Sequence, residues 1–237
     1  MDTPHRMPRG ARWLAGVTGL AAIGWAGTAA VNWARYGRAV PPRAEESDPL
    51  LDAFMPNYEV VERHHIHVAA PADVTLAAAR ELDLLSTLIV RAVFKGRELL
   101  LGAEPDAEQR PKGLLALTQS LGWRVLAEVP GREVVMGGAT KPWTANPTFR
   151  SIPAAHFAGF NEPDYVKIVW TLRVDPVSAS ESIFRTETRA VATDAPARAK
   201  FRKYWAWFSP GIALIRRMLL EPVKAEAERR VRERLAA

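Results

Sequence analysis

The C-terminal third of the chain, residues 165–234, constrains the fold most strongly. Runs 165–174 and 182–192 are rich in β-branched residues and are separated by a turn, so we predict two adjacent antiparallel strands. A long basic helix follows from about Ala195. Strands followed by a helix with one apolar face predict a curved sheet that grips the helix, which then forms one wall of a hydrophobic cavity. The apolar residues of that face recur at steps of three and four: Phe201, Trp205, Phe208, Ile212, Ile215 and Leu219.

The composition is that of a globular protein without disulfides. Of the 237 residues, 48% are apolar and 24% are charged, which suits one domain and an appendage. The absence of cysteine excludes disulfide scaffolds, thiolate metal sites and cysteine nucleophiles. The sequence contains no nucleophile elbow, Walker loop, dinucleotide fingerprint or paired-carboxylate spacing. We therefore predict no catalytic residue and no cofactor.

Positive charge is concentrated towards the two ends of the chain. The formal net charge is +6, and residues 195–237 contain eleven Lys or Arg against four Glu. A chain of this kind can meet nucleic acid or an anionic membrane surface. Because no recognition helix, zinc finger or aromatic platform accompanies the charge, we predict no nucleic-acid partner and favour a membrane.

Residues 13–34 form an uncharged run of 22 residues behind a basic N-terminal tail, residues 1–12. As a helix this run would extend about 33 Å, enough to cross the hydrocarbon core of a bilayer. Trp13 and Trp33 stand at its ends, where interfacial aromatic residues are expected. We predict a single-pass transmembrane anchor. A cleaved signal peptide, with Thr28-Ala29-Ala30 as its cleavage site, and a soluble alanine-rich helix are the alternatives.

The rest of the chain divides into a linker, residues 35–57, and a globular domain, residues 58–237. The linker is rich in proline and charge, and we expect residues 43–49 to be solvated. Thr193 or Asp194 should cap the last helix, and Pro210 should kink or restart it. The order of elements is that of an α+β domain. Strands are predicted at 58–68, 123–128, 133–139, 165–174 and 182–192, helices at 74–82, 84–101, 114–121 and from 195, and an irregular packed segment at 140–163.

The passage from the last strand into the last helix has a characteristic sequence. It comprises residues 186–194, TETRAVATD, followed by Phe201, Tyr204-Trp205, Ser209-Pro210-Gly211 and residues 214–217. These residues resemble uncharacterised bacterial members of the START-like (SRPBCC) superfamily. The opening at 69–73, AAPAD, is similar to the strand–APxxV–helix start of that superfamily, although the following valine is one residue from the usual spacing.

This resemblance covers residues 58–230 and is strongest over 183–219. It implies a helix-grip fold, in which a curved antiparallel sheet wraps around the C-terminal helix and leaves a cavity between them. Members bind or transfer lipids, sterols and polyketides, and a few catalyse cyclisation or dehydration. The superfamily has no universal catalytic residue, so none is carried over. A bacterial member with an N-terminal anchor is expected in the inner membrane.

The predicted ligand contacts lie on the two walls of this cavity, although an aromatic stripe can also simply fill a core. Glu187 and Arg189 share one strand face with Arg185, opposite Phe184. If that face lines the cavity, the Arg–Glu pair can orient a polar head group; if it meets water, these are ordinary exposed pairs. The predicted contacts are Trp205, Phe208, Ile212 and Ile215 from the helix, Trp170 and Leu172 from the opposing strand, Phe160, Glu187 and Arg189.

Three histidines are candidates for metal binding or general-base catalysis. His65 and His67 lie two apart on a predicted strand, so they share a face and resemble half of a metal site. No third ligand is near in sequence, so we expect them on a solvent-facing edge and predict no metal. His156 lies beside Phe157 and is expected to be a packing residue rather than a general base.

Three functions are compatible with these observations. The leading hypothesis is binding or transfer of a hydrophobic small molecule or lipid, without chemistry, by a membrane-tethered domain. The alternative is a cyclase- or dehydratase-type enzyme that uses the same cavity. The third is a protein-interaction module whose interior is filled by its own side chains. A cluster of polar or titratable groups inside the cavity would favour the enzyme.

Overall fold

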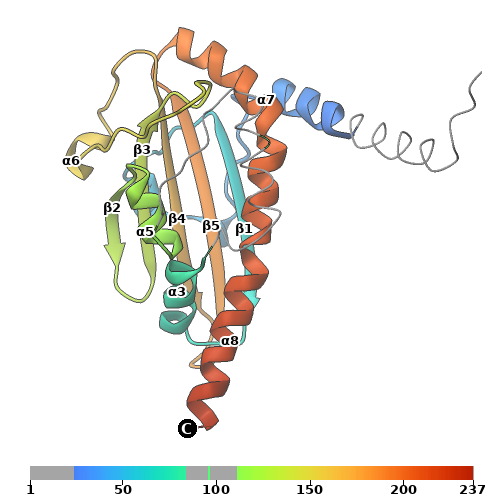
Figure 1. Ribbon diagram of the computed structural model, residues 1–237, viewed down its shortest axis with the longest axis vertical. Helices are drawn as coiled ribbons and strands as arrows, with labels where there is room; N and C mark the ends of the chain where they lie inside the picture. The colour runs from blue at the N-terminus through green and yellow to red at the C-terminus, as the bar shows by residue number, and fades with distance from the viewer. Residues whose placement is uncertain (1–23, 84–95, 97–110, 237) are drawn as a thin grey trace, which may run out of the picture.

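A five-stranded antiparallel sheet forms the centre of the molecule, in the order β1-β5-β4-β3-β2 (Figure 1). The computed structural model describes residues 24–83, 96 and 111–236. The predicted α+β class and the antiparallel pairing of the last two strands are confirmed. The strands are β1 (Val60–Val68), β2 (Arg124–Val129), β3 (Glu133–Thr140), β4 (Val166–Pro176) and β5 (Ser182–Ala192).

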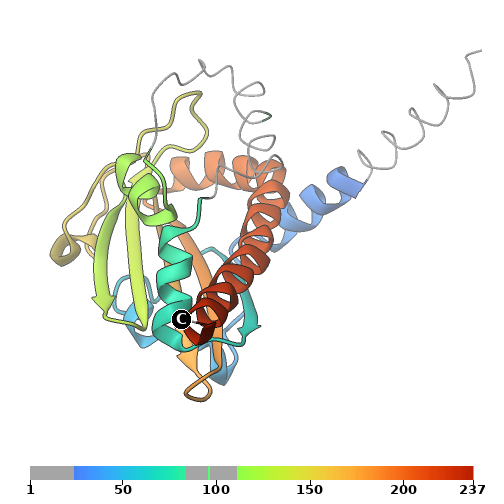
Figure 2. The same cartoon turned by 60° about the horizontal axis from the view of Figure 1, so that its bottom comes forward.

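Helices cover the two faces of the sheet unequally (Figures 1 and 2). One face carries α3 (Ala72–Glu81), α5 (Leu114–Ser120), α7 (Ala195–Met218) and α8 (Leu220–Ala236), and we call it the helix side. The opposite face, the outer side, is covered by short elements: η1 (Ala44–Glu46), α2 (Pro49–Asp52) and α6 (Ala154–Phe157). Because strand side chains alternate, neighbouring residues of β5 belong to different environments.

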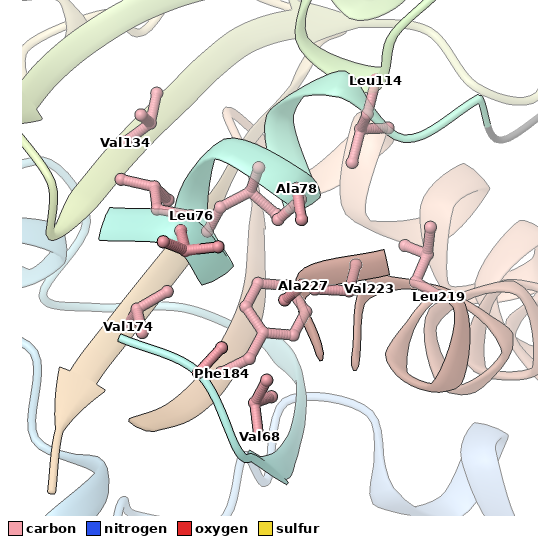
Figure 3. Close-up of a cluster of buried hydrophobic side chains, with 14 of the residues drawn as sticks. Val68, Leu76, Ala78, Leu114, Val134, Val174, Phe184, Leu219, Val223 and Ala227 are labelled. Atoms are coloured by element: carbon pink, nitrogen blue, oxygen red, sulfur yellow. The ribbon is translucent and has the colours of Figure 1, made fainter. Parts of the chain in front are cut away.

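The main apolar core lies between α3, α8 and the sheet (Figure 3). Trp170 and Leu172 of β4 and Phe184 of β5 are buried there against α8. The α8 side chains that meet them recur every four residues, as a helix lying on a sheet requires: Leu219, just before α8, and Val223 and Ala227 within it. The predicted grip of the sheet on the C-terminal helix is therefore confirmed.

The C-terminal helix is bent, as predicted. Asp194 caps α7 by accepting a hydrogen bond from the Ala197 N–H at 2.7 Å. Pro210 lies inside α7 and has no backbone N–H to donate to the carbonyl of the preceding turn. The helix changes direction along its length in both views (Figures 1 and 2). Before the bend, Phe201 and Trp205 pack on Val60, Val166 and Ala190. After it, Ile212 and Arg216 of α7 still contact the sheet, and α8 covers the main core.

Part of the predicted linker is packed against the outer side. Asp48 accepts a hydrogen bond from the Leu51 N–H at 2.8 Å and so caps α2, which begins at Pro49. Leu51 and Met55 are fully buried beside Val135 and Val169 of the sheet. The expectation that residues 43–49 are solvated is wrong for Asp48, which is buried.

Residues 24–35 form a helix that lies against α7. Within residues 24–83, 96 and 111–236, no helix is both long and apolar enough to cross a lipid bilayer. The rest of the predicted anchor, the N-terminal tail and nearly all of the predicted helix 84–101 lie outside the described residues.

Candidate ligand-binding site

A group of polar side chains lies on the helix side, between β1, β5 and α7. The strand register pairs Glu62 with Thr188 and His64 with Thr186, so all four side chains point towards the helices. From α7, the Arg216 Nη1 lies 3.5 Å from the Thr186 hydroxyl. We call these five residues the Arg216 cluster.

Trp170 forms the apolar floor beside this cluster. Its Cα is the register partner of Thr188, so the ring lies on the same face of the next strand. The guanidinium carbon of Arg216 is 5.2 Å from the centroid of the Trp170 ring, which is a cation–π distance. The cluster thus combines a cation, two hydroxyls, an imidazole and a carboxylate with one aromatic face.

Several members of the cluster lack the partners that buried polar groups normally have. Burial of the guanidinium lowers the pKa of Arg216 to about 10, with Glu62 acting in the opposite direction. Arg216 makes no ion pair with any other residue that the structure describes. The Thr188 hydroxyl and the His64 Nε2 are buried without a hydrogen-bond partner. An unpaired buried polar group costs about 1–3 kcal/mol, so the cluster is suited to a ligand that supplies the missing bonds.

His64 and Glu62 are close but not aligned. The His64 Nε2 lies 3.4 Å from a Glu62 carboxylate oxygen, a distance that allows ion pairing, yet the geometry is not that of a hydrogen bond. The sequence did not single out this pair, because its spacing drew attention to the neighbouring His65 and His67 instead. Both of those are exposed, as expected for a solvent-facing edge.

Arg216 was also missed, although the sequence contained a signal for it. Ile212, Ile215 and Leu219 were recognised as one helix face, and Arg216 stands among them at the same helical spacing. A charged residue inside an apolar stripe marks either an error in the pattern or a buried functional group.

The apolar residues predicted as ligand contacts are divided among separate clusters. Trp170 and Leu172 belong to the core under α8, whereas Trp205 and the half-buried Ile212 pack with Phe201 near the start of α7. Phe208 stacks on Tyr204 with ring centroids 4.8 Å apart. Ile215 is half-buried. Trp170 is the predicted contact residue that touches the Arg216 cluster in the described part of the chain, through its cation–π contact with Arg216.

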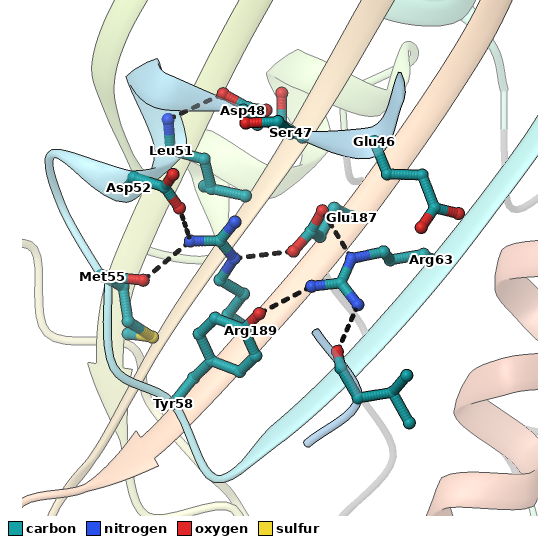
Figure 4. Close-up of polar contacts among 12 residues, drawn as sticks. Glu46, Ser47, Asp48, Leu51, Asp52, Met55, Tyr58, Arg63, Glu187 and Arg189 are labelled. Carbon is teal, nitrogen blue, oxygen red and sulfur yellow. Dashed lines mark hydrogen bonds and ion pairs between the residues drawn. The ribbon is translucent and has the colours of Figure 1, made fainter. Parts of the chain in front are cut away.

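Glu187 and Arg189 lie on the outer side, away from Trp170 and Trp205, in an ion-pair network (Figure 4). The Arg189 Nε donates to Glu187 at 2.7 Å, and its Nη1 donates to Asp52 at 2.5 Å and to the Met55 carbonyl at 2.8 Å. Arg63 lies 3.0 Å from the other Glu187 oxygen. The water-facing alternative for this pair is wrong, because α2 and the segment after it bury Glu187 and Arg189 on the side of the sheet opposite to the helices.

Phe160 is also on the outer side, where it packs edge-to-face on Tyr165 with centroids 5.8 Å apart. His156, expected to be a packing residue, is exposed. No group of three or more potential metal ligands occurs among residues 24–83, 96 and 111–236. These positions therefore contribute nothing to the Arg216 cluster.

Two cavities accompany these sites. The larger, about 400 Å³, lies between α3 and α8 and is lined by Ala78, Glu81, Leu82, Asp83, Pro222, Ala225, Glu226, Arg229 and Arg230. The smaller, about 20 Å³, lies among polar groups that include Asp48, Arg63, Thr171, Arg173, Arg185 and Glu187. The smaller cavity is also lined by His64 and Thr186 of the Arg216 cluster, whereas neither cavity is lined by Trp170, Trp205 or Arg216.

The chain was compared with known proteins. No protein-family model matches it, and no curated protein does. Among solved structures, it is similar to the hypothetical protein jhp0584 of Helicobacter pylori (8% identity, 79% of this chain and 98% of that chain, TM-score 0.38). Protein CV1439 of Chromobacterium violaceum is also similar (12% identity, 71% and 97%, TM-score 0.33).

A third similar structure is the Zhui aromatase/cyclase of Streptomyces sp. R1128, with 14% identity over 72% of this chain and 94% of that chain and a TM-score of 0.26. These superpositions are loose. The helix-grip architecture rests on the strand order and helix packing of the chain itself.

Proposed function

We propose that the domain binds an amphipathic small molecule or lipid between the sheet and the C-terminal helices. The observation that carries this proposal is Arg216, a half-buried cation that makes no ion pair with a carboxylate among the described residues. A guanidinium only donates hydrogen bonds, so the complementary ligand group is an acceptor oxygen such as a carboxylate or carbonyl. The apolar part of the ligand would lie along Trp170 and the half-buried side chains of α7.

The bend in α7 supports access to this site. Pro210 removes one hydrogen bond of the helix close to Arg216, which makes a small displacement of this part of α7 less costly. A displaced α7 would open the space between Arg216 and the β1–β5 edge without disturbing the core under α8. Binding would then replace the missing hydrogen bonds of Thr188 and His64.

Fluorescence titration with cis-parinaric acid, a fluorescent fatty acid, and with its uncharged methyl ester tests the proposal. We expect saturable binding of the acid to the purified full chain and about tenfold weaker binding by the Arg216→Met variant, corresponding to one charged hydrogen bond. The methyl ester should bind both proteins with similar affinity. Arg217→Met removes the adjacent, exposed arginine and is the matched control. No saturable binding, or the same loss in the control variant, would contradict the proposal.

A second function, catalysis in the same place, is favoured by the His64–Glu62 pair. A carboxylate 3.4 Å from an imidazole can orient it as a general base, and Arg216 can stabilise a developing oxyanion. Native mass spectrometry of copurified ligands distinguishes the two functions. If the domain catalyses a dehydration, or a cyclisation that eliminates water, His64→Gln should retain a ligand heavier by one water than that of the unmodified protein. The same ligand mass in both proteins would favour a carrier.

The proposal includes tethering to a membrane through the uncharged run 13–34, with the bacterial inner membrane as the location. It is supported by the length of the run and the tryptophans at its ends. Full-length protein should sediment with membranes and resist extraction by carbonate. A soluble full-length protein with an intact N-terminus would argue against the anchor, and a mature N-terminus near residue 31 would support the signal-peptide alternative.

A further inference from the structure

Exposed aromatic side chains are concentrated at one place on the described surface. Three tryptophans are exposed in the described part of the chain, and all three lie on the helix 24–35 or on α7: Trp25 (42%), Trp33 (40%) and Trp207 (58%). Leu214, also exposed, stands two helical turns after Trp207 on the same face of α7. We call these four residues the tryptophan face.

Specific contacts join the two helices into one surface. The Trp25 indole donates to the Trp207 carbonyl at 3.1 Å, and the Asn32 amide donates to the Ser209 hydroxyl at 2.6 Å. The Arg202 guanidinium lies 4.2 Å from the centroid of the Trp33 ring and donates to the carbonyl of the same residue. The helix 24–35 lies at the α7 end of the molecule, away from β2 and β3 (Figures 1 and 2).

The charge of these two helices has a single sign. Lys203 and Arg217 are exposed and make no ion pair with another described residue. Two other cations of α7, Arg198 and Lys200, are ion-paired with Glu59 and Asp164 of other elements. By contrast, α8 itself carries four Glu among its basic residues, and Glu226 is ion-paired with both Arg229 and Arg230. The helix 24–35 and α7 together contain seven Lys or Arg and no Asp or Glu: Arg35, Arg198, Lys200, Arg202, Lys203, Arg216 and Arg217.

We infer that the tryptophan face lies on an anionic lipid bilayer. Tryptophan is the side chain that membrane–water interfaces favour, and unpaired Lys and Arg are attracted to the anionic head groups beside it. A second copy of the chain would bring two positive surfaces together. Nucleic acid would explain the charge but not the exposed Trp207 and Leu214. The inference does not depend on a ligand at the Arg216 cluster. Because residues 24–35 pack on α7, it is an alternative to a helix that crosses the bilayer over the whole of residues 13–34.

The chain has no cysteine, so single labelling sites can be introduced without background. Leu214→Cys places a label on the tryptophan face, and Arg232→Cys places one on the exposed side of α8 as a matched control. Both full-length variants would carry an environment-sensitive NBD fluorophore. They would be mixed with vesicles of phosphatidylcholine alone or of phosphatidylcholine with phosphatidylglycerol.

We expect a severalfold rise and a blue shift of the fluorescence at position 214 with the anionic vesicles, and neither change at position 232. Added salt should reduce the response, because it screens the attraction. Reversing two charges, Lys203→Glu with Arg217→Glu, should raise the half-saturating concentration of anionic lipid at least tenfold.

Three outcomes would overturn the inference. The label at position 214 could remain in water with anionic vesicles, or respond equally to both kinds of vesicle. It could also respond without lipid in proportion to protein concentration, which would identify a second copy as the occupant. A response to a DNA duplex but not to vesicles would point to nucleic acid instead. Failure of cis-parinaric acid binding would leave this inference intact, because the two experiments use different residues.

Discussion

The arginines on the two sides of strand β5 differ in how they are paired. On the outer side, Arg189 donates to Glu187, Asp52 and a backbone carbonyl through its Nε and Nη1, although its Nη2 is buried without a hydrogen-bond partner. On the helix side, the Thr188 hydroxyl has no partner, and the Arg216 above it meets no carboxylate of the described chain. Arg189 therefore belongs to a structural ion-pair network, whereas Arg216 has no ion-pair partner in the described part of the chain.

The outer network has a clear structural role. Its bonds from Arg189 to α2 and to the Met55 carbonyl hold residues 48–55 against the sheet and so bury Leu51. The helix-side cluster holds no segment in place in this way. We therefore expect substitutions on the outer side to change stability and those on the helix side to change binding.

The sharpest test exchanges one arginine at a time for methionine, which keeps the apolar stem. Arg189→Met should lower the free energy of unfolding by about 3–4 kcal/mol, because Glu187 stays buried with a weaker set of partners. Arg216→Met should change it by less than about 1 kcal/mol, because the cation has no counterion and methionine can still pack on Trp170. Urea unfolding measures both. Equal losses would remove the distinction between the two sides.

A buried carboxyl on the outer side provides a test by pH. Burial and a hydrogen bond with Asp48 raise the pKa of Glu133 to about 8, although a bond from the Thr171 hydroxyl at 2.9 Å and the charge of Arg173 oppose the shift. The folded state therefore keeps a proton that the unfolded state loses above its ordinary pKa of 4.5. Stability is greatest below that value and falls as the pH rises towards 8.

We expect this fall to total about 3.5 kcal/mol between pH 5 and pH 8, since one proton gives a slope of at most about 1.4 kcal/mol per pH unit. Glu133→Gln, which stays neutral, should flatten the profile. Urea unfolding at several pH values gives the slopes of both proteins. A wild-type stability that rises over this range would show that the Asp48–Glu133 pair is ionised in the folded state.

The smallest effect compares two threonines on opposite faces of neighbouring strands. Thr171→Val removes the hydroxyl that bonds Glu133 and should destabilise the protein by about 1 kcal/mol. Thr188→Val removes a buried hydroxyl without a partner and should stabilise it by a similar amount. Thermal unfolding resolves the two signs. A loss of stability in both variants would mean that Thr188 has a bound partner, such as a ligand retained during purification.

Local patterns predicted much of the fold. The runs on either side of Pro130-Gly131 became the hairpin of β2 and β3, where Gly131 adopts a positive φ of 70°. The start of α7 at the Asp194 cap and its bend were also predicted. These features depend on residues close in sequence, so their chemistry can be read along the chain.

The site could be predicted only in part, because burial depends on distant segments. Arg185, Glu187 and Arg189 are charged residues on one face of a strand, as a water-facing strand would have, and the sequence offered no sign that α2 covers Glu187 and Arg189. Asp52, which pairs with Arg189, is 137 positions away. The aromatic stripe of α7 was correct as a pattern, but the bend directs its first half to a different cluster from the one under α8.

The sequence alone determined the class of this domain, since alternating strands and an amphipathic C-terminal helix admit few arrangements besides an antiparallel sheet packed on that helix. Only the tertiary structure decided which polar residues are paired. Strand register sets Glu62 beside Thr188 and His64 beside Thr186, and α7 sets Arg216 above them. The cost of burying a charge depends on what other segments bring to within a few ångströms of it, and that information lies in the packing of the elements, not in any one of them.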